Sequence, residues 1–181
     1  MKFEIFLISI LLLSCHSNKN NETEKIKLIV REWQNKTIKI PPGSIEYKVT
    51  GRDTICPDIW SKPYKILTYV DSIGCTGCQL GLPQWKQFID LSVIEQLDIG
   101  FIFIVHSVDY EIFELMLQES DFHYPIIYDR NNDFDKLNHF SKSAYRTFLI
   151  DKDNKVLLLG SPVYNPELIK LYKKTINANQ Q

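Results

Sequence analysis

The sequence lacks an excess of charge of either sign. Its 21 lysines and arginines nearly balance its 22 aspartates and glutamates, so that the net charge is −1, and the basic residues form no cluster. Nucleic-acid-binding proteins usually carry such clusters, so we expect no nucleic-acid partner. An internal repeat is also missing. The 181 residues leave room for one domain with an extension, and the composition, 44% hydrophobic and 24% charged, is typical of soluble globular proteins.

A long apolar run is missing too. The apolar run within residues 1–14 is much shorter than the roughly 20 residues of a transmembrane helix. It follows the positively charged Lys2 and matches the hydrophobic region of a signal peptide, which we exclude from the fold. The residues Leu12 to Cys15 resemble a bacterial lipobox, which implies cleavage before Cys15, acylation of its thiol and anchoring to a membrane surface. An ordinary secretory signal and an uncleaved anchor are the alternatives.

Cysteine is scarce, yet the 4 cysteines include one C-x-x-C motif, Cys75-Thr76-Gly77-Cys78. The apolar, β-rich residues 65–70 before the motif predict a strand, which ends in the polar residues and glycine of 71–74. After the motif, apolar residues recur at three- and four-residue steps and predict a helix with one buried face. The helix is predicted to run from Cys78, and the buried residues are Leu82, Trp85, Phe88, Ile89, Val93 and Leu97.

This order of elements puts Cys75 at the N-terminus of the predicted helix. Unpaired backbone N–H groups and the helix dipole stabilise a thiolate there, and thiol pKa values in such places fall to about 3.5–7.5. We therefore predict that Cys75 is the nucleophile. Cys78 follows one turn later on the same helix face and is predicted to be the resolving thiol. Thr76 and Gly77 would tune the reduction potential, and no cofactor beyond this redox-active disulfide is expected.

The order strand, C-x-x-C, helix resembles the thioredoxin superfamily. Pro83 occupies the place of the proline that kinks the first helix of that family, and residues 147–159 with the helix after them resemble its closing β-hairpin and helix. The resemblance covers about residues 62–174. It implies an α/β thioredoxin-like fold, with a central mixed sheet, helices on both faces, an N-terminal extension and an insertion before the closing β-hairpin. That insertion resembles membrane-tethered thioredoxin-like proteins and peroxiredoxins more than small cytosolic thioredoxin.

The expected organisation has four parts. They are a signal peptide (1–14), a lipidated Cys15 with a flexible polar tether (15–24), an N-terminal extension packing on the sheet (25–61) and a thioredoxin-like domain (62–181). In the extension, residues 25–33 predict a short amphipathic helix, while 37–40 and 45–49 alternate as strands do. The extension is expected to add strands to the sheet edge or to cover it, and its helix either packs or binds a partner.

The insertion begins after a second core strand. The continuous apolar run Gly100 to Val105 predicts a central strand covered on both sides. A helix over 109–120, capped by Ser107 or Asp109, a short strand over 124–129 and a short helix over 134–140 are expected to follow.

The sequence departs from thioredoxin beside the motif. The cis-proline that the family places before the strand facing the dithiol falls here on Tyr145 or Arg146, so we expect a trans peptide and a differently shaped substrate groove. The buried acid of the family falls near Tyr69. Asp71 is the nearest carboxylate, and at a strand end we expect it to be solvated, which leaves open whether it relays a proton to Cys78.

Some residues around the motif and before the strand that faces it resemble peroxiredoxins instead. Ser72 matches the Thr/Ser of their P-x-x-x-T/S-x-x-C motif ending at Cys75, and Arg146 precedes a strand beginning at Thr147 that resembles their TFxID segment. By this resemblance Arg146 would steady a thiolate or a peroxide oxygen. Thr68, however, stands where the proline of the motif belongs, and a peroxidatic cysteine normally has its resolving partner farther away than one helical turn.

Thiol–disulfide exchange is the function that these residues favour. Cys75 would attack a substrate disulfide and Cys78 would resolve the mixed disulfide, so the expected partners are protein thiols or disulfides and an unidentified electron donor or acceptor. The expected location is the bacterial cell envelope, lipid-anchored and facing the periplasm. A peroxidase using Cys75, and a redox-inert binding module with a structural Cys75–Cys78 bond, are the alternatives. A bond closing so small a loop stabilises a fold poorly.

Four further residues have less specific interpretations. Cys56 is either a small buried residue or a second resolving thiol. His106, His123 and His139 show no spacing typical of metal ligands, so hydrogen-bonded histidines are expected rather than a metal site. A zinc site built from Cys75, Cys78 and one or two more ligands is the remaining metal option, which a single C-x-x-C motif without a second pair supports poorly.

Overall fold

The computed structural model describes residues 21–41, 46–55, 58–71, 80–140 and 146–178. The chain divides into two compact units, one ending at Gln34 and the other beginning at Asn35. In the first unit residues 21–33 are helical. This confirms the helix predicted over 25–33, but residues 21–24 of the predicted tether are helical too, and Lys27 there donates a 2.8 Å hydrogen bond to Glu24 one turn away. Among the described residues, no helix has the length and apolar character needed to cross a membrane.

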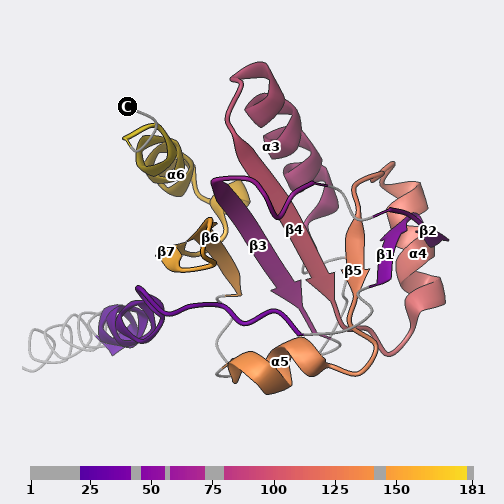
Figure 1. The fold of residues 1–181 in the computed structure, drawn as a ribbon, viewed down its shortest axis with the longest axis horizontal. Coiled ribbons are helices and arrows are strands. Elements are labelled where there is room, and N and C mark those ends of the chain that lie inside the picture. The colour runs from indigo at the N-terminus through magenta and orange to yellow at the C-terminus, as the bar shows by residue number, and fades with distance from the viewer. Residues whose placement is uncertain (1–20, 42–45, 56–57, 72–79, 141–145, 179–181) are drawn as a thin grey trace, which may run out of the picture. The chain divides into compact units, whose positions relative to one another are not determined.

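The second unit is built on one mixed sheet (Figure 1). Its strands, as far as the described residues show, stand in the order β2-β1-β5-β4-β3-β6-β7. Their bounds are β1 (Glu46–Val49), β2 (Arg52–Asp53), β3 (Tyr64–Val70), β4 (Ile99–Val105), β5 (Ile126–Tyr128), β6 (Thr147–Asp151) and β7 (Val156–Leu159). Strands β3, β4 and β5 are parallel, whereas β6 pairs with β3, β7 with β6, β1 with β5 and β2 with β1 in antiparallel fashion.

The two central strands are apolar because both of their faces are covered. Every residue of β3 and β4 is buried, which confirms the strand predicted over Gly100 to Val105. Successive side chains of a strand point to opposite faces. One set of alternate residues from β3 and β4 therefore belongs to the main hydrophobic core. The side chains of the other set point to the opposite face of the sheet.

Helices cover both faces of the sheet, as predicted. Helices α3 (Leu82–Ile94), α4 (Tyr110–Glu119) and α6 (Pro166–Ala178) contribute buried residues to the same core as Ile66 of β3 and Phe103 of β4. The short helix α5 (Asp133–Asn138) lies on the other face, where the ring of Phe134 is 5.3 Å from the ring of Tyr69 on β3. Helix α4, strand β5 and helix α5 together form the predicted insertion between β4 and β6.

Helix α3 begins at Leu82, and the predicted start at Cys78 lies outside the described residues. Gly81 directly before α3 has a φ of 63°, in the left-handed region that favours glycine. Pro83 occupies the first turn, where a missing N–H costs nothing. A side chain at position 81 would also overlap the Tyr164 hydroxyl, which lies against this glycine.

The buried face of α3 is confirmed at Leu82, Trp85, Phe88 and Ile89. It is wrong at Val93, whose residue surface is 71% exposed. Ser92 takes the buried place one position earlier, and its hydroxyl donates a 2.7 Å hydrogen bond to the Ile89 carbonyl oxygen. Leu97 lies beyond the end of the helix but still packs against the core. The apolar repeat therefore located the helix and its buried face, and was wrong by one position in the last turn, where Ser92 is buried in place of Val93.

The extension adds strands at the β5 edge of the sheet. Strand β1 agrees with the strand predicted over 45–49, and β2 follows it as an outer hairpin strand. The strand predicted over 37–40 is absent from these described residues, where only Thr37 forms an isolated antiparallel bridge, to Lys155. The backbone N–H of Ile38 donates to the Asn154 carbonyl oxygen at 2.8 Å, so this segment binds the turn before β7 without entering a ladder.

Candidate functional site

The predicted site belongs to one edge of the sheet. Strand β3 ends at Val70, and the chain continues through Asp71 into residues 72–79. Strand β6 begins at Thr147 directly after residues 141–145 and Arg146. Because β3 and β6 are antiparallel neighbours, the chain leaves β3 at the same edge at which it enters β6.

Most of the residues proposed from sequence lie outside the described residues. They are Cys75, Cys78, Ser72, Thr76, Gly77, Tyr145, Cys15 and Cys56. Their roles stay predictions. The structure does describe Asp71, Arg146 and Thr147, and it also describes the side chains that surround them at the edge of the sheet.

Asp71 and Arg146 form an ion pair across the two strand ends. The Arg146 guanidinium donates from Nη1 to Oδ2 of Asp71, and the side chains are only 18% and 13% exposed, respectively. The backbone supports the pair, because the Tyr69 N–H donates to the Arg146 carbonyl oxygen at 2.9 Å. The expectation that Asp71 is solvated at the strand end is therefore wrong. The partner that covers it stands 75 positions away in the sequence.

Tyr69 lies against this ion pair, on the face of the sheet that α5 covers. The Arg146 Cζ atom lies 5.5 Å from the centroid of the Tyr69 ring, a cation–π distance. The Tyr69 hydroxyl donates to Oδ1 of Asn132, just before α5. Burial first, and then the carboxylates of Asp135, Asp129 and Asp71, raise the pKa of Tyr69. The place near which the family carries a buried acid therefore holds a neutral phenol, and no local signal marked Asn132 as its acceptor.

Thr147 faces Thr68 across the β3–β6 ladder. The two residues are direct partners in the register, both are buried, and their hydroxyl oxygens are 3.2 Å apart. Each hydroxyl therefore satisfies the other within the sheet. Thr147, predicted as a supporting residue, fixes the register of the two strands at this edge, directly beside the Arg146–Asp71 pair.

His106 lies at the same edge, at the end of β4. Its backbone N–H donates to the Val70 carbonyl oxygen at 2.9 Å, and its ring Nδ1 is 2.8 Å from the Asp129 carbonyl oxygen. A carbonyl oxygen only accepts, so Nδ1 carries the proton and Nε2 is the acceptor in the neutral ring. The Asp129 carboxylate accepts from the backbone N–H groups of Asp133 and Phe134 at 2.8 and 3.0 Å and holds the start of α5.

The other two histidines lie elsewhere. His139 follows α5 with a φ of 54°, and His123 is exposed beside Asp121. Across the parts of the chain that the structure describes, no three His, Cys, Asp or Glu side chains gather closely enough to hold a metal ion.

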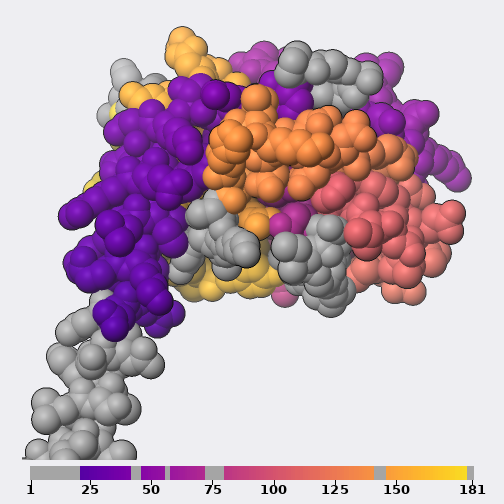
Figure 2. All heavy atoms as spheres, turned by 90° about the horizontal axis from the view of Figure 1, so that it is seen from below, coloured from indigo at the N-terminus to yellow at the C-terminus, as the bar shows by residue number. Residues whose placement is uncertain are grey.

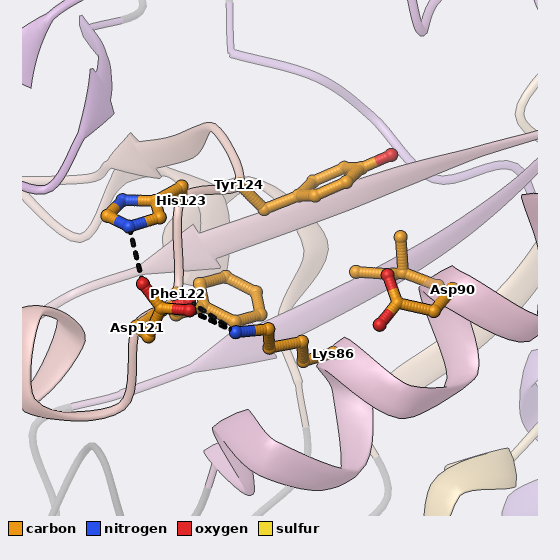
Figure 3. Close-up of a pocket in the computed structure, with 7 residues that line it drawn as sticks. Lys86, Asp90, Asp121, Phe122, His123 and Tyr124 are labelled. Atoms are coloured by element: carbon orange, nitrogen blue, oxygen red, sulfur yellow. Dashed lines mark hydrogen bonds and ion pairs between the residues drawn. The ribbon is translucent and has the colours of Figure 1, made fainter.

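A pocket of about 240 Å³ opens between α3 and the segment before β5 (Figure 3). Lys86 and His123 both point at the carboxylate of Asp121, and the His123 Nε2 atom is 2.8 Å from its Oδ1 atom. The hydrogen bond from Lys86, followed by that from His123, lowers the pKa of Asp121. These exposed groups satisfy one another, and this pocket contains none of the residues at the Asp71 edge.

Comparisons with known proteins identify the fold. No family model and no curated protein matches the chain. Among solved structures, a Chlorobium tepidum protein provisionally named thiol:disulfide interchange protein DsbE matches with a TM-score of 0.60 at 16% identity, over 79% of this chain and 99% of its own.

Two further structures agree. A Bacteroides thetaiotaomicron protein provisionally named a protein disulfide isomerase matches with a TM-score of 0.57 at 17% identity, over 80% of this chain and 90% of its own. A thioredoxin-like protein in its oxidized form matches with a TM-score of 0.54 at 16% identity, over 80% of this chain and 94% of its own. The TM-scores of 0.54 to 0.60 show a shared fold, although only 16–17% of the residues are identical. The chain therefore has the thioredoxin-like fold that its strand, C-x-x-C and helix order predicted.

Proposed function

We propose that the protein is a thiol–disulfide oxidoreductase that uses Cys75 and Cys78 as its redox pair. One observation carries the proposal. In a thioredoxin-like fold, the C-x-x-C motif occupies the connection between the end of the central parallel strand β3 and the start of helix α3. The names of similar structures, an interchange protein and a disulfide isomerase, support the same chemistry.

The proposed reaction is a pair of thiol–disulfide exchanges. The Cys75 thiolate attacks one sulfur of a substrate disulfide, forms a mixed disulfide and releases the other substrate sulfur as a thiolate. The Cys78 thiolate then attacks the Cys75 sulfur, which forms the Cys75–Cys78 bond and releases the second substrate thiolate. The two released thiolates take up two protons, and two electrons pass from the protein to the substrate. A dithiol partner must then reduce the Cys75–Cys78 bond, and in the reverse direction the pair oxidises its substrate.

The charges at the sheet edge weigh against the peroxidase alternative. In a peroxidase of this kind, the Arg146 cation would stabilise a thiolate or a peroxide oxygen. In the structure the Arg146 guanidinium binds the Asp71 carboxylate and lies over the Tyr69 ring. Because its charge is already balanced by a carboxylate, Arg146 is a weaker site for a second anion.

The proposed setting is the cell envelope of a bacterium. The apolar run within residues 1–14 and the lipobox-like Leu12 to Cys15 support cleavage and lipidation at Cys15, with the domain facing the periplasm. The proposed partners are protein disulfides or thiols, together with an electron donor or acceptor at the membrane.

Two variants, compared with the unmodified protein, test the proposal. The purified protein should reduce insulin disulfides with dithiothreitol as the electron source, and Cys75→Ser should abolish that activity. Cys78→Ser should instead accumulate a mixed disulfide on Cys75, visible as an adduct on non-reducing gels and released by dithiothreitol. Peroxide consumption that depends on Cys75, without insulin reduction, would establish the peroxidase. Absence of both activities in the folded protein would leave the redox-inert binding module.

A further inference from the structure

Helix α4 carries an apolar stripe on its outer side. Val108, Ile112 and Leu115 are 84%, 57% and 57% exposed. Ile112 and Leu115, three residues apart, lie on one face of the helix, and Val108 lies just before its first residue. Phe113 and Leu117 of the same helix are fully buried in the core, so Ile112 and Leu115 face away from it. We call these three residues the α4 stripe.

The chain segment that carries the α4 stripe is acidic. Asp109, Glu111 and Glu119 are exposed beside it, and the whole segment from Ser107 to Phe122 contains no lysine or arginine. A second copy of the same surface would bring like charges together. Charge complementarity instead favours a partner that combines apolar side chains with lysine or arginine.

The α4 stripe starts at the edge that carries the predicted dithiol. Val108 follows two positions after His106, whose backbone N–H is bonded to the Val70 carbonyl oxygen, and Asp71 comes next on β3. Figure 1 shows the chain running from the tip of the β4 arrow into the nearer end of α4. In the space-filling view of Figure 2, α4 (salmon) forms one border of the face on which α5 (orange) lies. The stripe therefore leads away from the site along the molecular surface.

From this continuity and charge we infer that the α4 stripe is the docking surface for the polypeptide substrate. The bound segment presents apolar side chains to Val108, Ile112 and Leu115 and lysine or arginine to the acidic rim, and it brings its disulfide to the edge after Asp71. The inference rests on the proposed oxidoreductase function and names its substrate class. So small an apolar surface suits a short-lived contact, which a substrate that must leave after each exchange requires.

Three disulfide probes separate docking from chemistry. The first is a cyclic peptide whose disulfide is flanked by leucine and lysine, the second has glutamate in place of lysine, and the third is oxidised glutathione. The variant Ile112→Ser/Leu115→Ser should lower kcat/KM for the lysine peptide about tenfold and leave glutathione unchanged. The matched control is Val93→Ser/Ile94→Ser, which removes two exposed apolar side chains at the far end of α3 and should change no rate.

A charge variant tests the acidic rim. The protein should prefer the lysine peptide to the glutamate peptide, and Glu111→Gln/Glu119→Gln should reduce that preference about three- to fivefold, as should raised salt. Thermal unfolding by circular dichroism verifies that each variant folds.

Three results overturn the inference. They are an equal effect of the control variant, an unchanged rate for the lysine peptide in Ile112→Ser/Leu115→Ser, and a loss of self-association in that variant by sedimentation, which would make the stripe a dimer contact. Failure of the proposed function would look different, because the unmodified protein would then exchange with none of the three disulfides.

Discussion

Removing the guanidinium of Arg146 should destabilise the protein far more than removing an exposed cation. Arg146→Met keeps much of the length of the side chain but leaves the Asp71 carboxylate, which is only 13% exposed, without this partner. Breaking a buried ion pair from one side costs about 3–5 kcal/mol, and partial solvent access reduces this to about 2–3 kcal/mol. Loss of the contact with the Tyr69 ring adds about 0.5–1 kcal/mol. We expect a total loss of about 3 kcal/mol.

Urea unfolding followed by circular dichroism measures this loss. The midpoint should fall with an unchanged slope, and the melting temperature should fall by about 6–12 °C for a domain of this size. The matched control is Lys62→Met, which breaks the 2.8 Å pair with Asp98, where the two side chains are 42% and 50% exposed. Its cost should be much smaller than that of Arg146→Met and should shrink at high salt, whereas the cost of Arg146→Met should not.

The double variant Asp71→Asn/Arg146→Met separates the charge from the packing. It removes the buried negative charge that Arg146→Met deprives of its guanidinium, so it should recover about 1–2 kcal/mol relative to Arg146→Met alone. The reasoning is refuted if Arg146→Met costs no more than Lys62→Met, or if the double variant is less stable than the sum of its two single changes.

Three further outcomes are expected. Gly81→Ala should cost about 1–2 kcal/mol in urea unfolding, because alanine is disfavoured at a φ of 63°. The Tyr164 side chain, which is exposed, should move aside, so Tyr164→Ala should restore little of this loss. Burial lowers the pKa of Lys65, whose Nζ donates to the Lys152 carbonyl oxygen at 3.2 Å, so Lys65→Met should stabilise the fold by about 1 kcal/mol at neutral pH, a gain that disappears in strong alkali. Burial raises the pKa of Tyr69 and Tyr172, so their stabilisation is complete below about pH 10 and is lost as the pH rises further; tyrosinate absorbance should increase for them only on alkaline unfolding.

The sequence predicted those helices and strands that are determined by residues close together in the chain. The continuous apolar run of β4, the apolar periodicity of α4 and the hairpin of β6 and β7 are each visible within a dozen residues, and each element was predicted within a few residues of its observed bounds. The same patterns predicted the insertion, because they place more helices and strands between β4 and β6 than a small thioredoxin has. The resemblance added the mixed sheet with helices on both faces and the closing β-hairpin, and the order of the strands comes from the structure.

Features that depend on distant residues were missed. The burial of Asp71 results from Arg146 on the neighbouring strand, and the strand-end position alone suggested a solvated carboxylate. The acceptor of the Tyr69 hydroxyl, Asn132, stands 63 positions further along the chain. Val93 continued the apolar repeat of α3, but the core accepts Ser92 instead because its hydroxyl is satisfied within the helix. The helix N-terminus inferred for Cys75 falls on residues that the structure does not describe, so that part of the site stays a prediction.

The order of strands has a consequence for how such a protein can change. Strand β6 returns to pair with β3, and Thr147 meets Thr68 there, although the whole excursion from Ser107 to Phe140 separates them in the chain. Within that excursion β5 pairs with β4 and β1, and α4 adds Phe113 and Leu117 to the core, so these parts have to be kept. The outer face of α4 takes no part in either, so substitutions there could direct the same reaction to a different substrate without shifting the β3–β6 ladder.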